Sequence, residues 1–268
     1  MTKISNLSFS ISIVIIILSL FASSFGIAFP SLYANESVKL AADFRGQDFA
    51  TLLIAIPLFT YSLLSARKGS VRGILMRLGI LVFFIYQYLQ YSVGTAFNYL
   101  YFIYIMIFSL SFVALAIGII ELDLDRLKRC LAYKFPLLAT AICEMTLAVM
   151  LAVMWISKAL ERYYSGIKGH LDRETSVMMI EQTMDLGFLV PIGLSAGCFL
   201  LMKKIAGFIL TGMTMIGSIC LLSTFISARI ASQMKEIEVP LEEQIFGYGG
   251  MLILLFFTYK FYKSIPEK

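Results

Sequence analysis

Three carboxylates lie in or beside long apolar stretches of this sequence, where they could bind a cation or exchange a proton. Asp48 and Asp185 each precede an apolar run that contains a proline, Pro57 in the first case and Pro191 in the second. Glu144 lies well inside a third apolar run. An isolated charge is costly in an apolar environment, and acids at membrane depth usually face a partner or a watery cavity. These three acids are therefore the first candidates for chemistry.

A stripe of polar side chains accompanies them. Gln87, Gln90, Tyr91 and Gly94 share one face at helical spacing, and Asn98 comes just beyond. Lipid does not satisfy an amide, so the glutamines and Asn98 need hydrogen bonds to another helix or a hydrated cavity. We favour a cavity wall. Several tyrosines near this stripe are typical of an interfacial aromatic belt: Tyr86, Tyr88, Tyr99, Tyr101 and Tyr104.

Each acid also has a simpler interpretation. If helices begin at Asp48 and Asp185, both carboxylates are N-caps at the positive ends of helix dipoles. The alternative is a paired-acid mouth that attracts a cation or exchanges a proton. The side chains that would join such a mouth are Gln47, Glu181 and Gln182. For Glu144, the alternative is a structural hydrogen bond to a neighbouring helix.

The elements that carry these residues are membrane helices. Hydrophobic residues make up 59% of the 268 residues and charged residues 15%, whereas soluble domains carry about 25% charged residues. The run Leu7–Phe29 contains no charge and is long enough to span a bilayer as a helix. It ends at Phe29-Pro30, a poor cleavage site, so we interpret it as a retained helix and not a signal peptide. The runs are too long, and alternate too little, for strands of a barrel.

The sequence predicts an all-α polytopic transmembrane bundle of about eight helices, forming one membrane domain over residues 1–268. The segment 158–183 is expected to hold a short interfacial helix or a structured flap. The predicted spans are 7–29, 49–66, 74–93, 97–120, 136–157, 184–202, 206–228 and 245–262.

Charge asymmetry predicts the orientation of this bundle. Of the 22 basic residues, 14 fall on the side that holds both termini, whereas 12 of the 17 acidic residues fall in the loops of the other side. Basic residues concentrate in cytoplasmic segments. We therefore expect both termini in the cytoplasm and the protein in the plasma membrane. The net charge of +5 is then an orientation signal, and we expect no nucleic-acid partner.

Two segments share a layout that indicates an internal duplication. Asp48, Pro57 and the basic pair Arg67-Lys68 in the first are matched by Asp185, Pro191 and Lys203-Lys204 in the second. This predicts two four-helix halves, 1–130 and 131–268, which would be parallel repeats about an axis along the membrane normal. Some transporters are built in this way.

Motifs for other chemistry give little support. Gly193-Leu194-Ser195-Ala196-Gly197 matches the G-x-S-x-G pattern, but within a membrane helix its glycines favour close helix packing. The only histidine is His170, and the four cysteines form no C-x-x-C pair, so neither a two-histidine haem nor a redox pair is expected. There is no H-E-x-x-H, Walker A or G-x-G-x-x-G sequence. We therefore expect no cofactor and no metal site.

Three stretches carry a resemblance to a known group: Gly46-Gln47-Asp48, Arg67-Lys68-Gly69-Ser70-Val71-Arg72-Gly73 and the run 97–104. Together with Asp185-Leu186-Gly187 and Val190-Pro191, they resemble a group of uncharacterised polytopic membrane proteins of bacteria and archaea. The resemblance covers roughly residues 45–110 and 180–205. This chain has Arg67-Lys68 where the group has two arginines, and Tyr101 where phenylalanine is usual. The resemblance implies a membrane fold and no particular activity.

These observations leave three classes of function open. The favoured one is a transporter or channel for a small solute or ion, with a proton or small cation as ligand. The second is a non-catalytic membrane subunit or sensor that binds a ligand or partner on its acidic outer face. The third is a membrane enzyme acting on lipid or quinone, which is least favoured because no nucleophile–base pair is visible. Besides the lipid bilayer, the chain could have further copies of itself as partners. The candidate binding residues are Asp48, Gln87, Gln90, Asn98, Glu144 and Asp185.

Overall fold

The computed structural model describes residues 4–131, 137–164 and 172–266, and that part of the chain is helical without any strand. Eight of its helices are long and apolar enough to cross a membrane. The predicted all-α bundle of about eight spans is therefore confirmed, and the protein is a multi-pass membrane protein by this measure. His170 lies outside the described residues.

The first half contains four spans. Ser5, Ser37 and Ser70 cap three of its helices, because each side-chain oxygen accepts a hydrogen bond from a backbone N–H three residues ahead. A short 3-10 helix, η1 (Pro30–Tyr33), joins the first span to the second. The helices are α1 (Asn6–Ala28), α2 (Val38–Ala50), the π-helix η2 (Thr51–Ala55), α3 (Ile56–Arg67), α4 (Val71–Gly94) and α5 (Tyr101–Ile120).

The second half repeats this order of helices after a short connecting helix, α6 (Leu124–Leu131). Asp172 caps the helix that opens its second span. The helices are α7 (Leu137–Tyr164), α8 (Arg173–Met184), the π-helix η3 (Asp185–Leu189), α9 (Val190–Leu201), α10 (Ile205–Gln233) and α11 (Leu241–Ser264).

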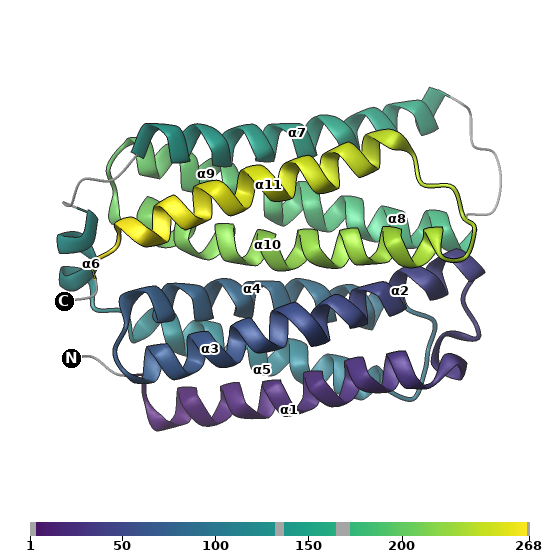
Figure 1. The fold of residues 1–268 in the computed structure, drawn as a ribbon, viewed down its shortest axis with the longest axis horizontal. Helices are drawn as coiled ribbons and strands as arrows, with labels where there is room; N and C mark the ends of the chain where they lie inside the picture. The colour runs from purple at the N-terminus through teal and green to yellow at the C-terminus, as the bar shows by residue number, and fades with distance from the viewer. Residues whose placement is uncertain (1–3, 132–136, 165–171, 267–268) are drawn as a thin grey trace.

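The spans lie side by side along the long axis of the molecule, with α1 to α5 on one side and α7 to α11 on the other (Figure 1). Both chain ends and α6 are at the same end of the bundle, called here the terminal end. The other end is called the distal end. That the terminal end is cytoplasmic stays a prediction from the charges.

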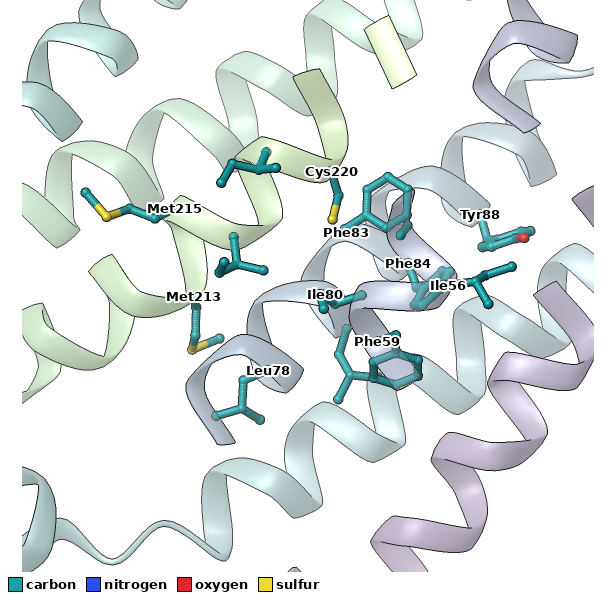
Figure 2. Packing of buried hydrophobic residues seen from close by; sticks show 14 of the residues in the cluster. Ile56, Phe59, Leu78, Ile80, Phe83, Phe84, Tyr88, Met213, Met215 and Cys220 are labelled. Carbon is teal, nitrogen blue, oxygen red and sulfur yellow. The ribbon is translucent and has the colours of Figure 1, made fainter. Parts of the chain in front are cut away.

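Apolar packing between the halves centres on α4 and α10. Figure 2 shows Leu78, Ile80 and Phe83 of α4 packed close to Met213 and Cys220 of α10. Phe59 of α3 meets Phe84 of α4 edge to face, with ring centroids 5.3 Å apart. Helix α4 is thus an interior helix, and its polar residues must find their partners inside the protein.

The second and sixth spans begin earlier than the sequence analysis predicted. They run over Val38–Arg67 and Arg173–Leu201, instead of beginning near residues 49 and 184. Asp48 and Asp185 are therefore not helix N-caps, and that interpretation is wrong. The separate interfacial helix expected within 158–183 is also wrong for its described part, because α7 continues to Tyr164 and α8 begins at Arg173. The residues at the start of α2, the end of α7 and the start of α8 are as polar as loop residues, but they belong to helices that continue beyond the apolar region.

Each of these two spans contains a π-helical break followed by a proline. The N–H of Ile56 donates to the carbonyl of Thr51, five residues back, and the N–H of Val190 donates to the carbonyl of Asp185 in the same way. The next residue in each case is a proline, Pro57 or Pro191, which has no N–H to donate. Single-turn π segments of this kind are found frequently at functional sites.

Three element bounds around the π-helical breaks share one offset between the two halves. The π segments start at 51 and 185, the following helices at 56 and 190, and the next spans at 71 and 205. Each difference is 134 residues (185 minus 51, 190 minus 56 and 205 minus 71). The neighbours correspond as well: α1 contacts α3 and α5, and α7 contacts α9 and α11. Between the halves, α4 contacts α10, α2 contacts α10, and α8 contacts α4.

Glycines at matching positions make matching contacts. A Cβ on Gly73 would lie 2.6 Å from the backbone nitrogen of Ala66, and one on Gly207 would lie 2.2 Å from that of Leu200. Each glycine thus lets a span pack against the end of the preceding one. The carbonyl of Met213 would lie 2.4 Å from a Cβ on Gly79, and these two positions also differ by 134.

Candidate functional site

A layer of hydrogen-bonded polar side chains crosses the bundle toward its distal end, with α4 at its centre. It contains two of the predicted acids and both predicted glutamines. We call it the α4 polar layer, and its members are Tyr33, Gln47, Asp48, Tyr86, Gln87, Gln90, Tyr91, Trp155, Glu181 and Asp185.

Asp48 lies on the first-half side of this layer and is 1% exposed. Its carboxylate accepts hydrogen bonds from Tyr33 Oη at 2.7 Å and from Tyr91 Oη at 3.3 Å. Gly26 of α1 makes room for it, because a Cβ there would lie 1.9 Å from Asp48 Oδ2. Tyr33 and Tyr91 both pack on Phe44. The carboxylate is therefore enclosed by aromatic rings and held by two hydroxyl donors.

Tyr33 remains a hydrogen-bond donor under all ordinary conditions. Its pKa is raised well above the usual range by burial and, to a smaller extent, by the negative charge of Asp48. A raised pKa means that the phenol keeps its proton as the pH increases through the neutral range. Tyr33 can therefore stabilise an ionised Asp48 without losing its own proton.

Asp185 lies on the second-half side of α4 and is 9% exposed. Its two oxygens accept one hydrogen bond each at 2.6 Å, from Tyr86 Oη and from Trp155 Nε1. Gln182, one turn before Asp185, donates to the backbone carbonyl of Trp155 at 2.8 Å. Asp48 and Asp185 thus have similar surroundings, each with two neutral donors of which one comes from α4.

The glutamines of α4 link these two sites to neighbouring helices. Gln87 Nε2 donates to Gln47 Oε1 at 2.6 Å, and Gln90 Nε2 donates to Glu181 Oε1 at 2.6 Å. Gln87 and Gln90 are 1% and 3% exposed, so both face protein and not lipid. Gln87 reaches α2 and Gln90 reaches α8, so α4 ties the second and sixth spans together.

Ion pairs at the distal edge of the layer join the halves. Arg229 of α10 donates to Asp43 of α2 at 2.7 Å and to Glu243 of α11 at 3.1 Å. Arg173 of α8 binds Glu36 at 3.0 Å. Since both arginines belong to the second half, each neutralises an acid of the first half. Asp48 and Asp185 have no ion pair within 4.0 Å in the part of the chain that the structure describes.

Glu144 lies apart from this layer. It is 7% exposed on α7 and accepts a hydrogen bond from Thr214 of α10 at 2.9 Å. It precedes Trp155 by eleven positions on the same helix, which places it about 16 Å nearer the terminal end at the usual helical rise.

The close-packing interpretation of Gly193 and Gly197 is confirmed, because a Cβ on either would lie within 3.1 Å of a side chain of α7.

Asn98 is also separate from the layer. It precedes α5 in the loop at the distal end, where its Oδ1 accepts from the N–H of Leu100 at 2.9 Å. Its amide nitrogen donates to the carbonyl of Ala96 at 3.2 Å. These are local bonds that shape the start of α5. Of the six predicted residues, the structure therefore brings Asp48, Gln87, Gln90 and Asp185 into one layer and places Glu144 and Asn98 elsewhere.

Several functional candidates were missed from the sequence. The sequence pattern does not predict a role for Tyr33 or Trp155, and it predicts an interfacial aromatic belt for Tyr88 and Tyr104, which are each only 1% exposed. Arg77 was counted among the cytoplasmic basic residues, yet it is completely buried in α4. One signal could have identified Arg77, because it precedes Tyr91 by two heptads and so shares the buried polar face of α4.

Arg77 is held by serines of α1. Its Nε donates to Ser12 Oγ at 3.2 Å and its Nη2 donates to Ser8 Oγ at 2.5 Å. A buried arginine requires such partners because its charge cannot be left without them. This site lies toward the terminal end, below Asp48 in the same half of the bundle.

Trp155 offers a direct measurement of the Asp185 site, because it is the only tryptophan of the chain. At alkaline pH, Asp185→Asn should move its fluorescence emission to shorter wavelength, since a negative charge beside the indole nitrogen stabilises the excited state more than the ground state. Asp48→Asn is the matched control and should leave the spectrum unchanged. An unaltered spectrum in Asp185→Asn would contradict the bond between Trp155 and Asp185.

No family model, curated protein or solved structure matches this chain.

Chemically, the layer holds two buried carboxylates that are each supplied with neutral donors and form no ion pair within 4.0 Å among the described residues. The charge of Arg45, one turn before Asp48 on α2, acts on Asp48 from a longer distance. A carboxylate in this setting is stabilised as an anion by its donors and destabilised by the loss of water. It can therefore change between charged and neutral forms with a modest change in its surroundings. Among the described residues, no three His, Cys, Asp or Glu side chains lie close enough together to hold a metal ion.

Proposed function

We propose that this protein moves protons across the membrane, with Asp48 and Asp185 as the exchanging groups. The observation that carries the proposal is the pairing of a buried carboxylate with a π-helical break in each half of the bundle. Asp48 precedes its break by three residues, and Asp185 is the first residue of the other. Transporters commonly place their coupling-ion sites at interrupted spans between repeats.

Carboxylates at membrane depth support this function energetically. Such groups are expensive in a bilayer and usually mark ion or proton pathways. Asp48 and Asp185 form no ion pair like that of Asp43 with Arg229, and Arg45 acts on Asp48 only from beyond ion-pair distance, so a proton is the simplest compensation for their charge. The donor to Asp185 from Trp155 is an N–H group, which cannot coordinate a metal cation. This favours a proton over a metal ion as the exchanged species.

The breaks could also supply the motion that transport needs. A π segment followed by a proline leaves fewer regular hydrogen bonds to hold the two parts of a span in line. Rotation at Thr51–Ala55 or Asp185–Leu189 would move the adjoining carboxylate relative to α4. Each carboxylate could then gain or lose its donors on α4, and with them its proton.

We also propose that the two halves of the bundle are structural repeats. The shared offset of 134 residues at three element bounds, and the matching neighbours of α4 and α10, support two repeats related by a rotation. In such an arrangement, residues on the rotation axis contact their own equivalents, as Gly79 and Met213 do. The second and sixth spans would then be equivalent moving parts on opposite sides of this axis.

Reconstitution tests the function directly. The purified full-length chain is inserted into liposomes that contain a pH-sensitive dye, and a potassium gradient with valinomycin sets the membrane potential. The dye should respond faster than in protein-free liposomes, because protons follow the potential through the protein. Equal responses in the two preparations would contradict proton movement.

A membrane subunit or sensor is the second candidate, and one observation favours it. A hollow opens to the surface at the distal end beside the connection between α10 and α11. It is lined by Gln233, Glu236, Ile237, Glu238, Val239, Pro240 and Gln244. Its acidic side chains suit a basic ligand or partner. Absence of proton movement in the liposome experiment would make this function the leading one.

A further inference from the structure

The buried face of α1 carries serines along most of its length. Ser8, Ser12, Ser19 and Ser23 are all 0% exposed, and their spacings of four, seven and four residues place them on one face of the helix. Hydroxyl groups inside a membrane protein need hydrogen-bond partners because lipid offers none. Ser12 and Ser19 donate to carbonyls of their own helix, so their oxygens remain available as acceptors, and the further partners of the four serines indicate what this face does.

The two ends of this serine face meet two buried charged side chains of the first half, Arg77 and Asp48. At the terminal end, Ser8 and Ser12 accept hydrogen bonds from Arg77. At the distal end, Ser23 faces Asp48 and Tyr88. Gly26, one turn further along, allows Asp48 to approach α1. The serine face thus extends from an arginine to the proposed proton-exchanging carboxylate.

Along the bundle axis, a buried serine of α5 lies at the height of the largest interval in this series. The N–H of Ser5 donates to Glu121 Oε1, so the start of α1 and the end of α5 lie at about the same level along the bundle axis. At the usual helical rise, Ser12 lies about 10 Å above this level and Ser19 about 21 Å above it. Because α5 runs in the opposite direction, Ser111 lies about 15 Å above the same level. Successive hydroxyls are then roughly 4–6 Å apart along the axis, which one bridging water molecule can span.

Unpartnered or loosely bonded polar atoms concentrate along the same line. Within the described part of the chain, the Ser111 hydroxyl and Nη1 of Arg77 have no hydrogen-bond partner. The hydroxyls of Ser23, Tyr88 and Tyr104 have only loose polar contacts. Ser23 makes them with Asp48 and Tyr88, and Tyr104 makes them with Tyr33 and Asn98. Each of the five side chains that carry these unpartnered or loosely bonded atoms is at most 1% exposed. Buried polar groups in proteins are nearly always paired, either with protein or with internal water. Five such atoms along one line point to internal water as their common partner.

We infer that a file of internal water molecules runs along the serine face of α1, between Arg77 and Asp48, and connects Asp48 with the terminal end. We call this line the serine track, and its members are Ser8, Ser12, Ser19, Ser23 and Ser111. The role of the track as a proton route rests on the proposed function, whereas its hydration does not. Arg77 lies at the terminal end of the track, where its positive charge opposes the leak of free cations.

Hydroxyl-radical labelling of the intact protein tests the hydration. X-ray irradiation produces radicals from water, so a buried side chain is oxidised rapidly only when water lies beside it. Tyr88 and Tyr104 should be oxidised about ten-fold faster than Phe83 and Phe84, which are equally buried but apolar. Tyr262, whose hydroxyl donates to the Gly212 carbonyl, is a tyrosine control and should react slowly. Equal rates for Tyr88, Tyr104 and Phe83 would overturn the track.

A blocking variant tests the route. Ser111→Val places two methyl groups in the middle of the track and should lower both the oxidation of Tyr104 and the proton flux in liposomes. Ser223→Val is the matched control, because Ser223 is buried on α10 with its hydroxyl bonded to the Ile219 carbonyl. Unchanged flux in Ser111→Val would show that protons take another route.

The two experiments distinguish a failure of the proposed function from a failure of the serine track. If the wild-type protein moves no protons but Tyr88 and Tyr104 are oxidised rapidly, the proposed function fails and the hydrated track stands. If protons move but both tyrosines react as slowly as Phe83 and Tyr262, the track fails and the function stands. Wild-type labelling needs no variant, so this outcome is independent of whether Ser111→Val folds.

Discussion

Asp48→Asn should reduce proton flux in reconstituted liposomes to the rate of protein-free liposomes. The substitution keeps the shape of the side chain and removes the group that gains and loses a proton. Tyr33 and Tyr91 can rotate their hydroxyls to suit the amide, so the packing with Phe44 should persist. The flux is measured with the internal pH dye, and the amount of reconstituted protein is matched between variants.

Two further variants make this result specific. Asp125→Asn removes a carboxylate whose side chain is 82% exposed and should leave the flux unchanged. Tyr33→Phe removes one donor to Asp48 while the carboxylate remains, so flux should fall by a smaller factor than in Asp48→Asn. Full flux in a correctly folded Asp48→Asn protein would eliminate Asp48 as an exchanging group.

Gly46→Ala should destabilise the protein strongly because α2 and α10 touch at this position. The new Cβ would lie 2.4 Å from the carbonyl of Ser227 and 2.6 Å from Cα of Ala228. Both are backbone atoms, so relief requires α2 to move away from α10, at a cost of about 3 kcal/mol. The midpoint of thermal unfolding in detergent should fall by roughly 10 °C.

Gly249→Ala is the matched control. Gly249 is also inside a helix, α11, but a Cβ there meets nothing within 4 Å. The change in helix propensity is the same for both substitutions, so the difference between the two melting temperatures isolates the contact with α10. Equal melting temperatures for the two variants would mean that α2 and α10 do not pack as described.

The membrane fold could be predicted from the sequence because its cause is local. Long uncharged runs such as Leu7–Phe29 must form helices in lipid, where each backbone group needs a partner within the helix. The prolines of the second and sixth spans, Pro57 and Pro191, also follow the 134-residue offset, whereas the predicted match of Asp48 with Asp185 does not, because Asp48 corresponds to Gln182. Gln87 and Gln90 could be assigned to the interior from the same reasoning, since an amide facing lipid has no partner.

The ends of the helices could not be predicted equally well. The sequence changes from apolar to polar near Asp48 and Asp185, and that change was interpreted as the start of a helix. The structure continues both helices by about ten residues, because polar residues there bond to neighbouring helices and ion pairs such as Arg229 with Asp43 neutralise their charges. Polarity alone does not distinguish a helix in a polar protein interior from a loop in water.

Only the tertiary structure decided which polar residues meet. Tyr33 with Asp48, Trp155 with Asp185 and Arg77 with Ser8 are separated by 15, 30 and 69 positions in the chain. In water, an apolar stripe shows which face of a helix is buried. In a bilayer, lipid and protein interior are about equally apolar, so the sequence of a span indicates its facing direction only weakly. The rotation and tilt of each helix, set by close contacts such as that of Gly79 with Met213, therefore determine the site.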